Sequence, residues 1–164
     1  MKVKNPPFPI VLCLSSLLLA VACTKNNNSL PTDGTLSARA GTATFNAAQV
    51  AGVYSHSLGF MAVLGYTISS NDTTGFQIQF SYVPPVGITF SSDTTATGLT
   101  YFVPGKRYDA FLGQGVVIVN LSVADTVNHK LAGTFSGTVY NDANPNDSAV
   151  ITNGKFISTY SVQP

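Results

Sequence analysis

The sequence predicts an all-β domain, an antiparallel β-sandwich or flattened barrel of about eight to ten strands. Three observations support this prediction. The chain contains no Glu and few Lys residues, so the best helix formers are scarce. Val, Ile, Thr, Tyr and Phe, which suit a pleated and half-buried surface, take their place. Turn-forming residues also interrupt the apolar segments about every 8–12 residues, the spacing expected of a sandwich or barrel.

Alternation of apolar and polar residues marks the individual strands. Phe76, Ile78 and Phe80 alternate with polar residues, which indicates one buried and one wet face. Residues 117–123 and 131–139 read as a long hairpin around a turn at 125–128, and Gly154 after Asn153 predicts a β-bulge. Strands 40–45 and 49–55 are expected to form the first pair, joined at 46–48, and residues 69–75 a turn. The other expected strands are 60–68, 76–80, 88–90, 99–103, 108–112, 149–152 and 155–162.

The first 22 residues have the three parts of a secretory signal peptide. Lys2 and Lys4 form a basic start, residues 10–19 are almost entirely apolar, and small residues follow up to Ala22. The apolar segment is far shorter than the ~20 residues that a membrane-spanning helix needs. Cys23 stands directly after the predicted cleavage site at Ala22, as in bacterial lipoproteins, whose cysteine thiol is diacylated. We therefore expect a lipid anchor on Cys23.

Simple secretion is the alternative to lipidation. The commonest lipoprotein signal has Leu three positions before the cysteine, where this chain has Ala20, with Leu19 one position further away. Ala20 and Ala22 also satisfy ordinary signal peptidase, which would cut the same bond and leave Cys23 unmodified. Cys13 is not a second acylation site, because Leu12 before it is too large for cleavage.

The composition of the mature chain narrows its chemistry. Removal of residues 1–22 from the 164 leaves 142, enough for one domain with a real core. Cys23 is then the only cysteine, which excludes an intramolecular disulfide and cysteine-based metal or thiol chemistry in the fold. Six cations face seven Asp residues, a net charge of 6 − 7 = −1. So weak a cationic surface argues against nucleic acid as a partner.

The chain is expected to have three parts: a signal peptide over residues 1–22, a lipidated cysteine with a flexible tether over 23–35, and an all-β domain over 36–164. Residues 24–35 are polar, contain Pro and Gly, and lack periodicity. At full extension they would hold the domain up to about 40 Å from the membrane.

Several segments resemble a known family. Besides the signal and the Asn-rich tether, they are residues 44–47, the segment from Lys130 to Gly137, and the segment from Ile151 to Phe156. Together they look like those of a family of small Bacteroidetes-type lipoproteins that is classed as a domain of unknown function. The resemblance implies a small β-domain and a cell-envelope location, as an outer-membrane lipoprotein. By analogy with such proteins, the lack of an acidic run after Cys23 favours the periplasmic side over the cell surface.

Four of the seven aspartates begin an Asp-Thr or Asp-Ser tripeptide, at 72–74, 93–95, 125–127 and 147–149. The pattern resembles the O-glycosylation acceptor of exported proteins in that bacterial group. It would place glycans on Thr73, Thr94, Thr126 and Ser148. Asp followed by Thr or Ser is also a common turn sequence, because the short carboxylate bonds nearby backbone. Both interpretations place these positions in turns or loops.

No set of residues predicts a catalytic site, a metal centre or a cofactor. His56 and His129 are the only histidines, each beside a predicted turn, and we expect both in solvent. Residues 142–147 place oxygen atoms at alternating positions, as a calcium loop does. However, Asp147 stands where that loop needs Gly and Asn153 where it needs Glu, so we expect a plain hairpin.

Aromatic residues between positions 80 and 111 are the most suggestive binding feature. Tyr and Phe on a β-face stack on sugar rings or lipid, and Tyr82, Tyr101 and Tyr108 are the candidate ligand-binding rings. Core packing is the simpler explanation of most of them. The full set is Phe80, Tyr82, Phe90, Tyr101, Phe102, Tyr108 and Phe111.

These observations favour a non-enzymatic binding or interaction module of the cell envelope. Its expected partners are the membrane, through the lipid on Cys23, and an envelope protein or glycan. One alternative is a carrier of an apolar ligand or glycan that uses the aromatic residues. Another is a hydrolase with an Asp/Tyr/Ser site, which needs at least two aspartates in one cleft with displaced pKa values. Lys106 and Arg107 are expected to form a solvated turn rather than an anion site.

Overall fold

The computed structural model describes residues 33–80, 97–110 and 115–164, together with the main chain of residues 89–91. These residues form eleven strands in one sheet and no helix, which confirms the all-β class with one strand above the expected range. In this part of the chain, nothing helical is long and apolar enough to cross a bilayer. The strands are β1 (Gly34–Ala40), β2 (Ala43–Asn46), β3 (Gln49–Ser55), β4 (Phe60–Ser69), β5 (Asp72–Phe80), β6 (Thr89–Ser91), β7 (Gly98–Val103), β8 (Lys106–Ala110), β9 (Val117–Asp125), β10 (Lys130–Asn141) and β11 (Asn144–Gln163).

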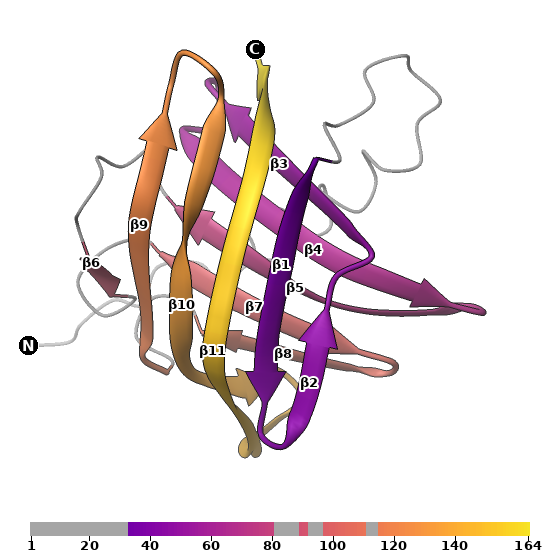
Figure 1. Cartoon of the computed structure of the whole chain (residues 1–164). Coiled ribbons are helices and arrows are strands. Elements are labelled where there is room, and N and C mark those ends of the chain that lie inside the picture. The colour runs from indigo at the N-terminus through magenta and orange to yellow at the C-terminus, as the bar shows by residue number, and fades with distance from the viewer. Residues whose placement is uncertain (1–32, 81–88, 92–96, 111–114) are drawn as a thin grey trace, which may run out of the picture.

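The sheet folds into two layers that cross each other (Figure 1). The front layer contains β2, β1, β11, β10, β9 and β6, and the rear layer contains β3, β4, β5, β7 and β8. Pairing of β10 with β11 closes a ring through β3, β4, β5, β7 and β8. The result is a flattened barrel, one of the two forms that the sequence predicted.

The layers are joined at two corners, one at each end of the molecule. At the upper end in Figure 1, β11 leaves β1 after residue 158 and pairs with β3 over residues 160–163. At the lower end, β10 leaves β9 after residue 137 and pairs with β8 through Tyr140 and Asn141. Each corner is therefore made by a strand that runs past the end of its neighbour in the front layer.

The strand pairing at the upper corner differs from the predicted one. The sequence predicted an antiparallel sheet whose first pair was 40–45 with 49–55. Instead, β2 pairs with β1, and β3 pairs with β4 and, in parallel, with β11. The chain already reverses at Gly41, whose φ of 57° is a conformation that glycine adopts at low cost. Because the chain turns this early, residues 43–46 pair with β1, and β3 becomes part of the rear layer.

One hairpin connection is shorter than the sequence predicted, and another agrees with the prediction. β4 and β5 are joined by Ser70 and Asn71, where a seven-residue turn at 69–75 was expected. Ser70 has a φ of 57°, as tight hairpin turns require. β10 and β11 are joined by Asp142 and Ala143. The expected plain hairpin is thus confirmed at residues 142–147.

β11 is a single strand of 20 residues that carries the predicted bulge. Phe135 pairs with Gly154 and Gly137 with Ile151, so one residue of β10 faces two of β11. The register against β1 shifts at the same level, and Asn153 has a φ of 54°. The bulge therefore bends the strand without ending it, which is why 149–152 and 155–162 form one strand rather than two.

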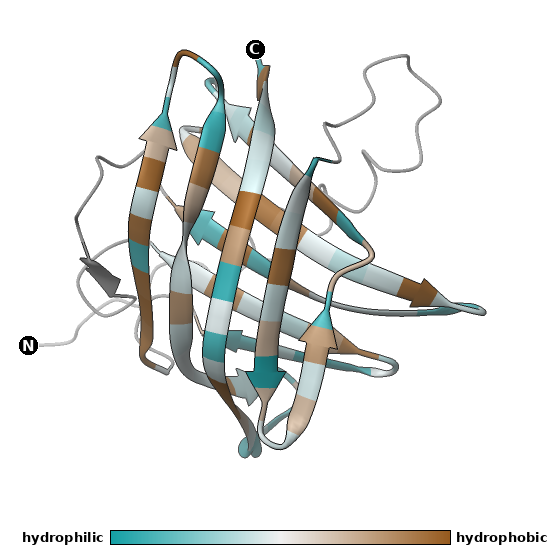
Figure 2. Ribbon diagram, viewed as in Figure 1, coloured by the Kyte–Doolittle hydropathy of each residue, from teal (hydrophilic) through white to brown (hydrophobic). Residues whose placement is uncertain are grey.

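The core lies between the layers, and β9 alternates buried and exposed residues, whereas the first half of β4 is almost entirely buried and apolar. Figure 2 shows the resulting bands of apolar and polar residues along the strands. Phe76 of β5 is fully buried. Its ring lies 5.3 Å from that of Phe45 in β2 and 5.8 Å from that of Phe135 in β10. Gly65 of β4 faces Leu36 of β1 so closely that a Cβ there would lie 2.7 Å from the Leu36 Cβ. The absence of a side chain at Gly65 therefore sets how closely the layers approach.

We predict that Gly65→Ala destabilises the domain by about 1–3 kcal/mol, because the new methyl group would push Leu36 out of its packing position. Leu36→Ala alone should cost about 2–5 kcal/mol through its cavity. Urea denaturation of both single variants and the double variant measures the coupling. The double variant should lose less stability than the sum of the singles, and strict additivity would contradict this account of the contact.

Candidate functional site

Charged side chains gather at the lower end, where the β7–β8 hairpin meets the β10–β11 turn. β8 supplies three of them, the turn one and β11 one, and all five are linked by ion pairs or by a carboxyl–carboxyl hydrogen bond. We call this group the lower-end cluster. Its members are Lys106, Arg107, Asp109, Asp142 and Asp147.

One half of the cluster is built around Asp147. Its Oδ2 accepts hydrogen bonds from Lys106 Nζ at 3.0 Å, Tyr108 OH at 3.1 Å and Asn141 Nδ2 at 3.0 Å. The hydrogen bond from Lys106, and then those from Asn141 and Tyr108, hold the pKa of Asp147 below its ordinary value against a smaller effect of desolvation. The same contact with Asp147 raises the pKa of Lys106. The Asp147 carboxylate is therefore ionised and accepts hydrogen bonds from three side chains.

The other half is built around Arg107. Its Nε lies 2.7 Å from Asp109 Oδ2 and 3.5 Å from Asp142 Oδ2, and the Thr100 hydroxyl donates to the other oxygen of Asp109. Burial, then the neighbouring charge of Asp109, raises the pKa of Asp142 to about 6, although Arg107 acts in the opposite direction. A hydrogen bond between the two carboxyl groups favours the protonated form further. Asp142 therefore keeps its proton to a higher pH than an ordinary aspartate does, and we call Asp142 and its partner Asp109 the acid pair.

Main-chain contacts fix this geometry at the lower corner. The amide of Asp142 donates to the carbonyl of Arg107 at 3.1 Å, beside the short ladder between β10 and β8. The buried side chain of Asn141 accepts a hydrogen bond from the amide of Ala143 at 2.9 Å and donates to Asp147. The cluster therefore links the front layer to the rear layer.

Tyr101 and Tyr108, two of the predicted ligand-binding rings, connect the core to the cluster. Tyr101 stacks on Phe76 with ring centroids 4.7 Å apart, and Tyr108 stacks on Tyr101 at 5.7 Å. Tyr108 is buried, with only its hydroxyl reaching Asp147. Burial, with a contribution from Tyr108, raises the pKa of Tyr101. Tyr108 thus belongs to the packed interior and Tyr101 is half-buried against it, whereas Tyr82 lies outside the described residues.

Three of the four predicted glycosylation sites can be placed. Thr126 is exposed in the β9–β10 turn, as expected. The expected turn or loop position is wrong for the other two, since Thr73 is half-buried on β5 and Ser148 is exposed on β11. In the turn, Asp125 Oδ1 accepts hydrogen bonds from the amides of Val127 and Asn128, as expected of a turn aspartate. Thr94 lies outside the described residues, as do Ala22 and Cys23. Modification at all these positions stays a prediction.

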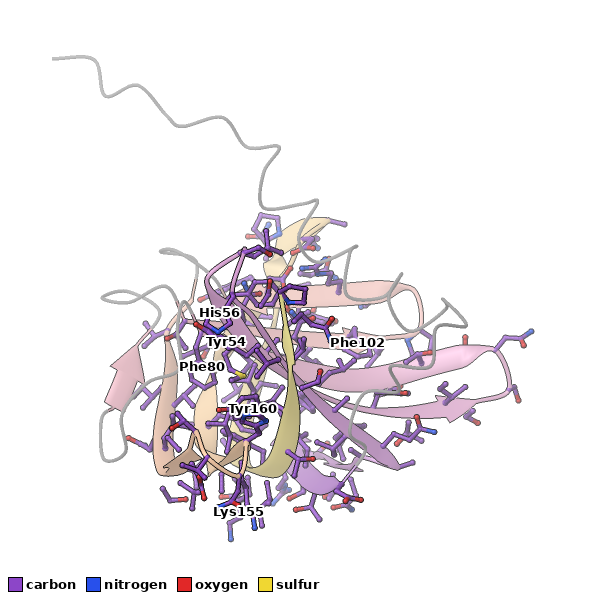
Figure 3. All side chains as sticks on the ribbon, turned by 90° about the horizontal axis from the view of Figure 1, so that it is seen from above. Tyr54, His56, Phe80, Phe102, Lys155 and Tyr160 are labelled. Carbon is purple, nitrogen blue, oxygen red and sulfur yellow. The ribbon has the colours of Figure 1, made fainter. Side chains whose placement is uncertain are left out.

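The two histidines are exposed, as predicted, and both lie at the upper end. The ring of His56 is 4.7 Å from that of Tyr54, and the ring of His129 is 5.1 Å from that of Tyr160. Figure 3 shows His56, Tyr54 and Tyr160 from this end. Within residues 33–80, 97–110 and 115–164, no three His, Cys or Asp side chains gather closely enough to hold a metal ion.

Comparison of the chain with family models, curated proteins and solved structures gave no significant match. The interpretation of the lower-end cluster as a candidate site therefore depends on its geometry alone. Lys106 and Arg107 were expected to form only a solvated turn. The available signal was the pair of adjacent cations together with two later aspartates, Asp142 in the β10–β11 turn and Asp147 on β11. Its use required knowledge that β8 pairs with β10.

We predict that the acid pair makes stability depend on pH. The folded protein binds the Asp142 proton more tightly than the unfolded chain does, because its pKa rises from 3.8 to about 6. Stability from this group is therefore fully present below about pH 4 and is lost as the pH rises through about 6. Urea denaturation from pH 4 to pH 8 should show this loss in the native protein.

Asp142→Asn should remove the loss between about pH 4 and pH 6 and be at least as stable as the native protein at pH 7, since the amide imitates the protonated acid. Asp72→Asn, an exposed substitution in the β4–β5 hairpin, is the control that should keep the native pH dependence. Equal slopes for Asp142→Asn and the native protein would contradict the acid pair.

Proposed function

We propose that this chain is a lipid-anchored cell-envelope protein whose β-domain is a non-enzymatic binding or interaction module. The observation that carries the proposal is Cys23, which follows a complete signal peptide and becomes the only cysteine of the mature chain. The family resemblance supports an outer-membrane lipoprotein on the periplasmic side. Its partners would be the membrane and an envelope protein or glycan.

The outer face of the front layer supports an interaction through hydrogen bonds. The registers place Thr134 beside Lys155, Lys155 beside Ser37, and Ser37 beside Asn46, a row that crosses four strands. Thr134, Lys155 and Asn46 are exposed. Hydroxyl, amide and ammonium groups arranged in this way suit a polar partner such as a glycan.

Intact-mass measurement of the membrane-extracted mature protein tests the anchor. We expect the polypeptide from Cys23 onward to carry the added mass of acyl chains. Cys23→Ser should release the protein to the soluble fraction without changing its thermal unfolding, because residue 23 precedes the β-domain. An unmodified Cys23 in the native protein would overturn lipidation and leave simple secretion.

The acid pair favours a second candidate, a hydrolase that uses Asp142 as acid and Asp109 as base. The pKa of Asp142 is raised while that of nearby Asp147 is lowered, the kind of divergence by which carboxyl groups acquire different catalytic roles. Tyr108 contributes a hydroxyl to the same end of the molecule. This candidate stands second because every carboxylate of the cluster already has a partner inside the protein.

Nitrophenyl glycosides and esters test this candidate through nitrophenol release. A hydrolase of this kind should turn one of them over near pH 6 and lose about 10²–10⁴-fold in rate in Asp142→Asn. Asp72→Asn, the same substitution at an exposed position of the β4–β5 hairpin, should keep the native rate. No release above the buffer rate, or equal rates in the native protein and Asp142→Asn, would remove the hydrolase candidate.

A further inference from the structure

The upper end exposes three large apolar side chains on three separate segments. Val127 in the β9–β10 turn is 86% exposed, Leu58 in the β3–β4 turn 49%, and Val162 near the end of β11 41%. Pairing of Lys130 with Thr159 and of Ser55 with Gln163 places these segments at one end of the barrel. Figure 1 shows the β9–β10 turn and the C-terminus projecting together there.

The β9–β10 turn is built to present Val127. Asp125 Oδ1 accepts hydrogen bonds from the amides of Val127 and Asn128, at 2.9 and 2.8 Å, and its Oδ2 accepts one from the Asn128 side chain at 2.7 Å. These donors hold the pKa of Asp125 below its ordinary value, so the carboxylate stays ionised. The Asp125 carboxylate is hydrogen-bonded within the turn, so the side chain that projects from the turn is the apolar one of Val127.

The chain enters the domain at this same end. Gly34, the first residue of β1, lies level with Ser158 of β11, which in turn faces Leu131 at the start of β10. Residues 24–33 can extend at most about 35 Å from that point. The twelve residues of β10 span about 40 Å between the two ends. The tether that leads to Cys23 therefore leaves the domain at the upper end, opposite the lower end where the charged cluster lies.

We propose that the upper end docks on the lipid bilayer to which Cys23 is anchored, with Val127, Leu58 and Val162 inserted at the boundary between headgroups and acyl chains. This inference rests on the proposed lipid anchor. Three apolar side chains are too few to bind a membrane alone, but the short tether keeps the upper end at a high effective concentration beside the lipid. The lower-end cluster and the outer faces of both layers would then point toward partners.

The charges at this end make the expected contact apolar rather than electrostatic. Lys130 pairs with Asp125, whose carboxylate is already bonded, and Asp33 precedes β1. Among the described residues, this end therefore presents no cluster of lysine or arginine side chains. Docking should occur on zwitterionic phosphatidylcholine and need no anionic lipid.

Tryptophan fluorescence tests the orientation, since the native chain contains no Trp. Three single-Trp variants sample the surface: Val127→Trp at the upper end, Ile68→Trp at the side in the β4–β5 hairpin, and Ala143→Trp at the lower end. The mature, unlipidated chain is coupled through Cys23 to a maleimide lipid in phosphatidylcholine vesicles. Brominated acyl chains in these vesicles quench a Trp that enters the bilayer.

We expect brominated lipid to reduce the emission of Val127→Trp about twofold and to leave Ala143→Trp and Ile68→Trp nearly unchanged. In the Val127→Trp background, Leu58→Asp should weaken the quenching, whereas Thr134→Asp on the outer face of β10 should not. Absence of quenching in Val127→Trp, or equal quenching at all three positions, would overturn the docking. Because maleimide coupling replaces natural acylation, this outcome is independent of the mass measurement that tests the anchor.

Discussion

The ring of Phe76 brings together aromatic side chains from both layers of the barrel. It contacts Phe45 and Phe135 from the front layer and stacks on Tyr101 from its own layer. From Phe135 the contacts continue to Phe156 of β11, and from Tyr101 they continue to Tyr108. Buried aromatic rings contribute large areas of apolar contact, and the β-domain contains no cysteine that could add a disulfide. The fold therefore depends on this packing, and Gly65 allows the layers to come close enough to make it.

The same ring stack explains why the lower end is rigid enough to perturb a pKa. Tyr108 is held by Tyr101 on its inner side and ends in a hydroxyl that donates to Asp147. Asp109 follows directly on β8, and the amide of Asp142 donates to the carbonyl of Arg107 on the same strand, so the main chain brings the two carboxyl groups together. Desolvation and repulsion then act on a fixed pair, and the proton on Asp142 relieves both.

The features that could be predicted from the sequence are those determined by neighbouring residues, such as single strands and the bulge. Alternation from Val117 to Val123 defines β9, and Asn153 with Gly154 defines the bulge, because side-chain direction and backbone φ are settled by neighbouring residues. Pairings between distant segments were not predictable. The parallel contact of β3 with β11 depends on β11 running past the start of β1, which no local pattern records. The acid pair was missed for the same reason, since Asp109 and Asp142 meet only through the β8–β10 corner.

The chain has few charged residues, and their uneven distribution makes the lower end charged and the upper end more apolar. Five of the described charged residues belong to the lower-end cluster, where they neutralise one another across the layers. The upper end exposes Val127 and Leu58 on turns and Val162 near the end of β11, and Asp125 there is hydrogen-bonded within its own turn. A chain with more Lys and Glu would spread charge over both ends and lose this difference. In a protein tethered from the upper end, the polarity of the barrel matches an apolar lipid contact on one side and an aqueous surface on the other.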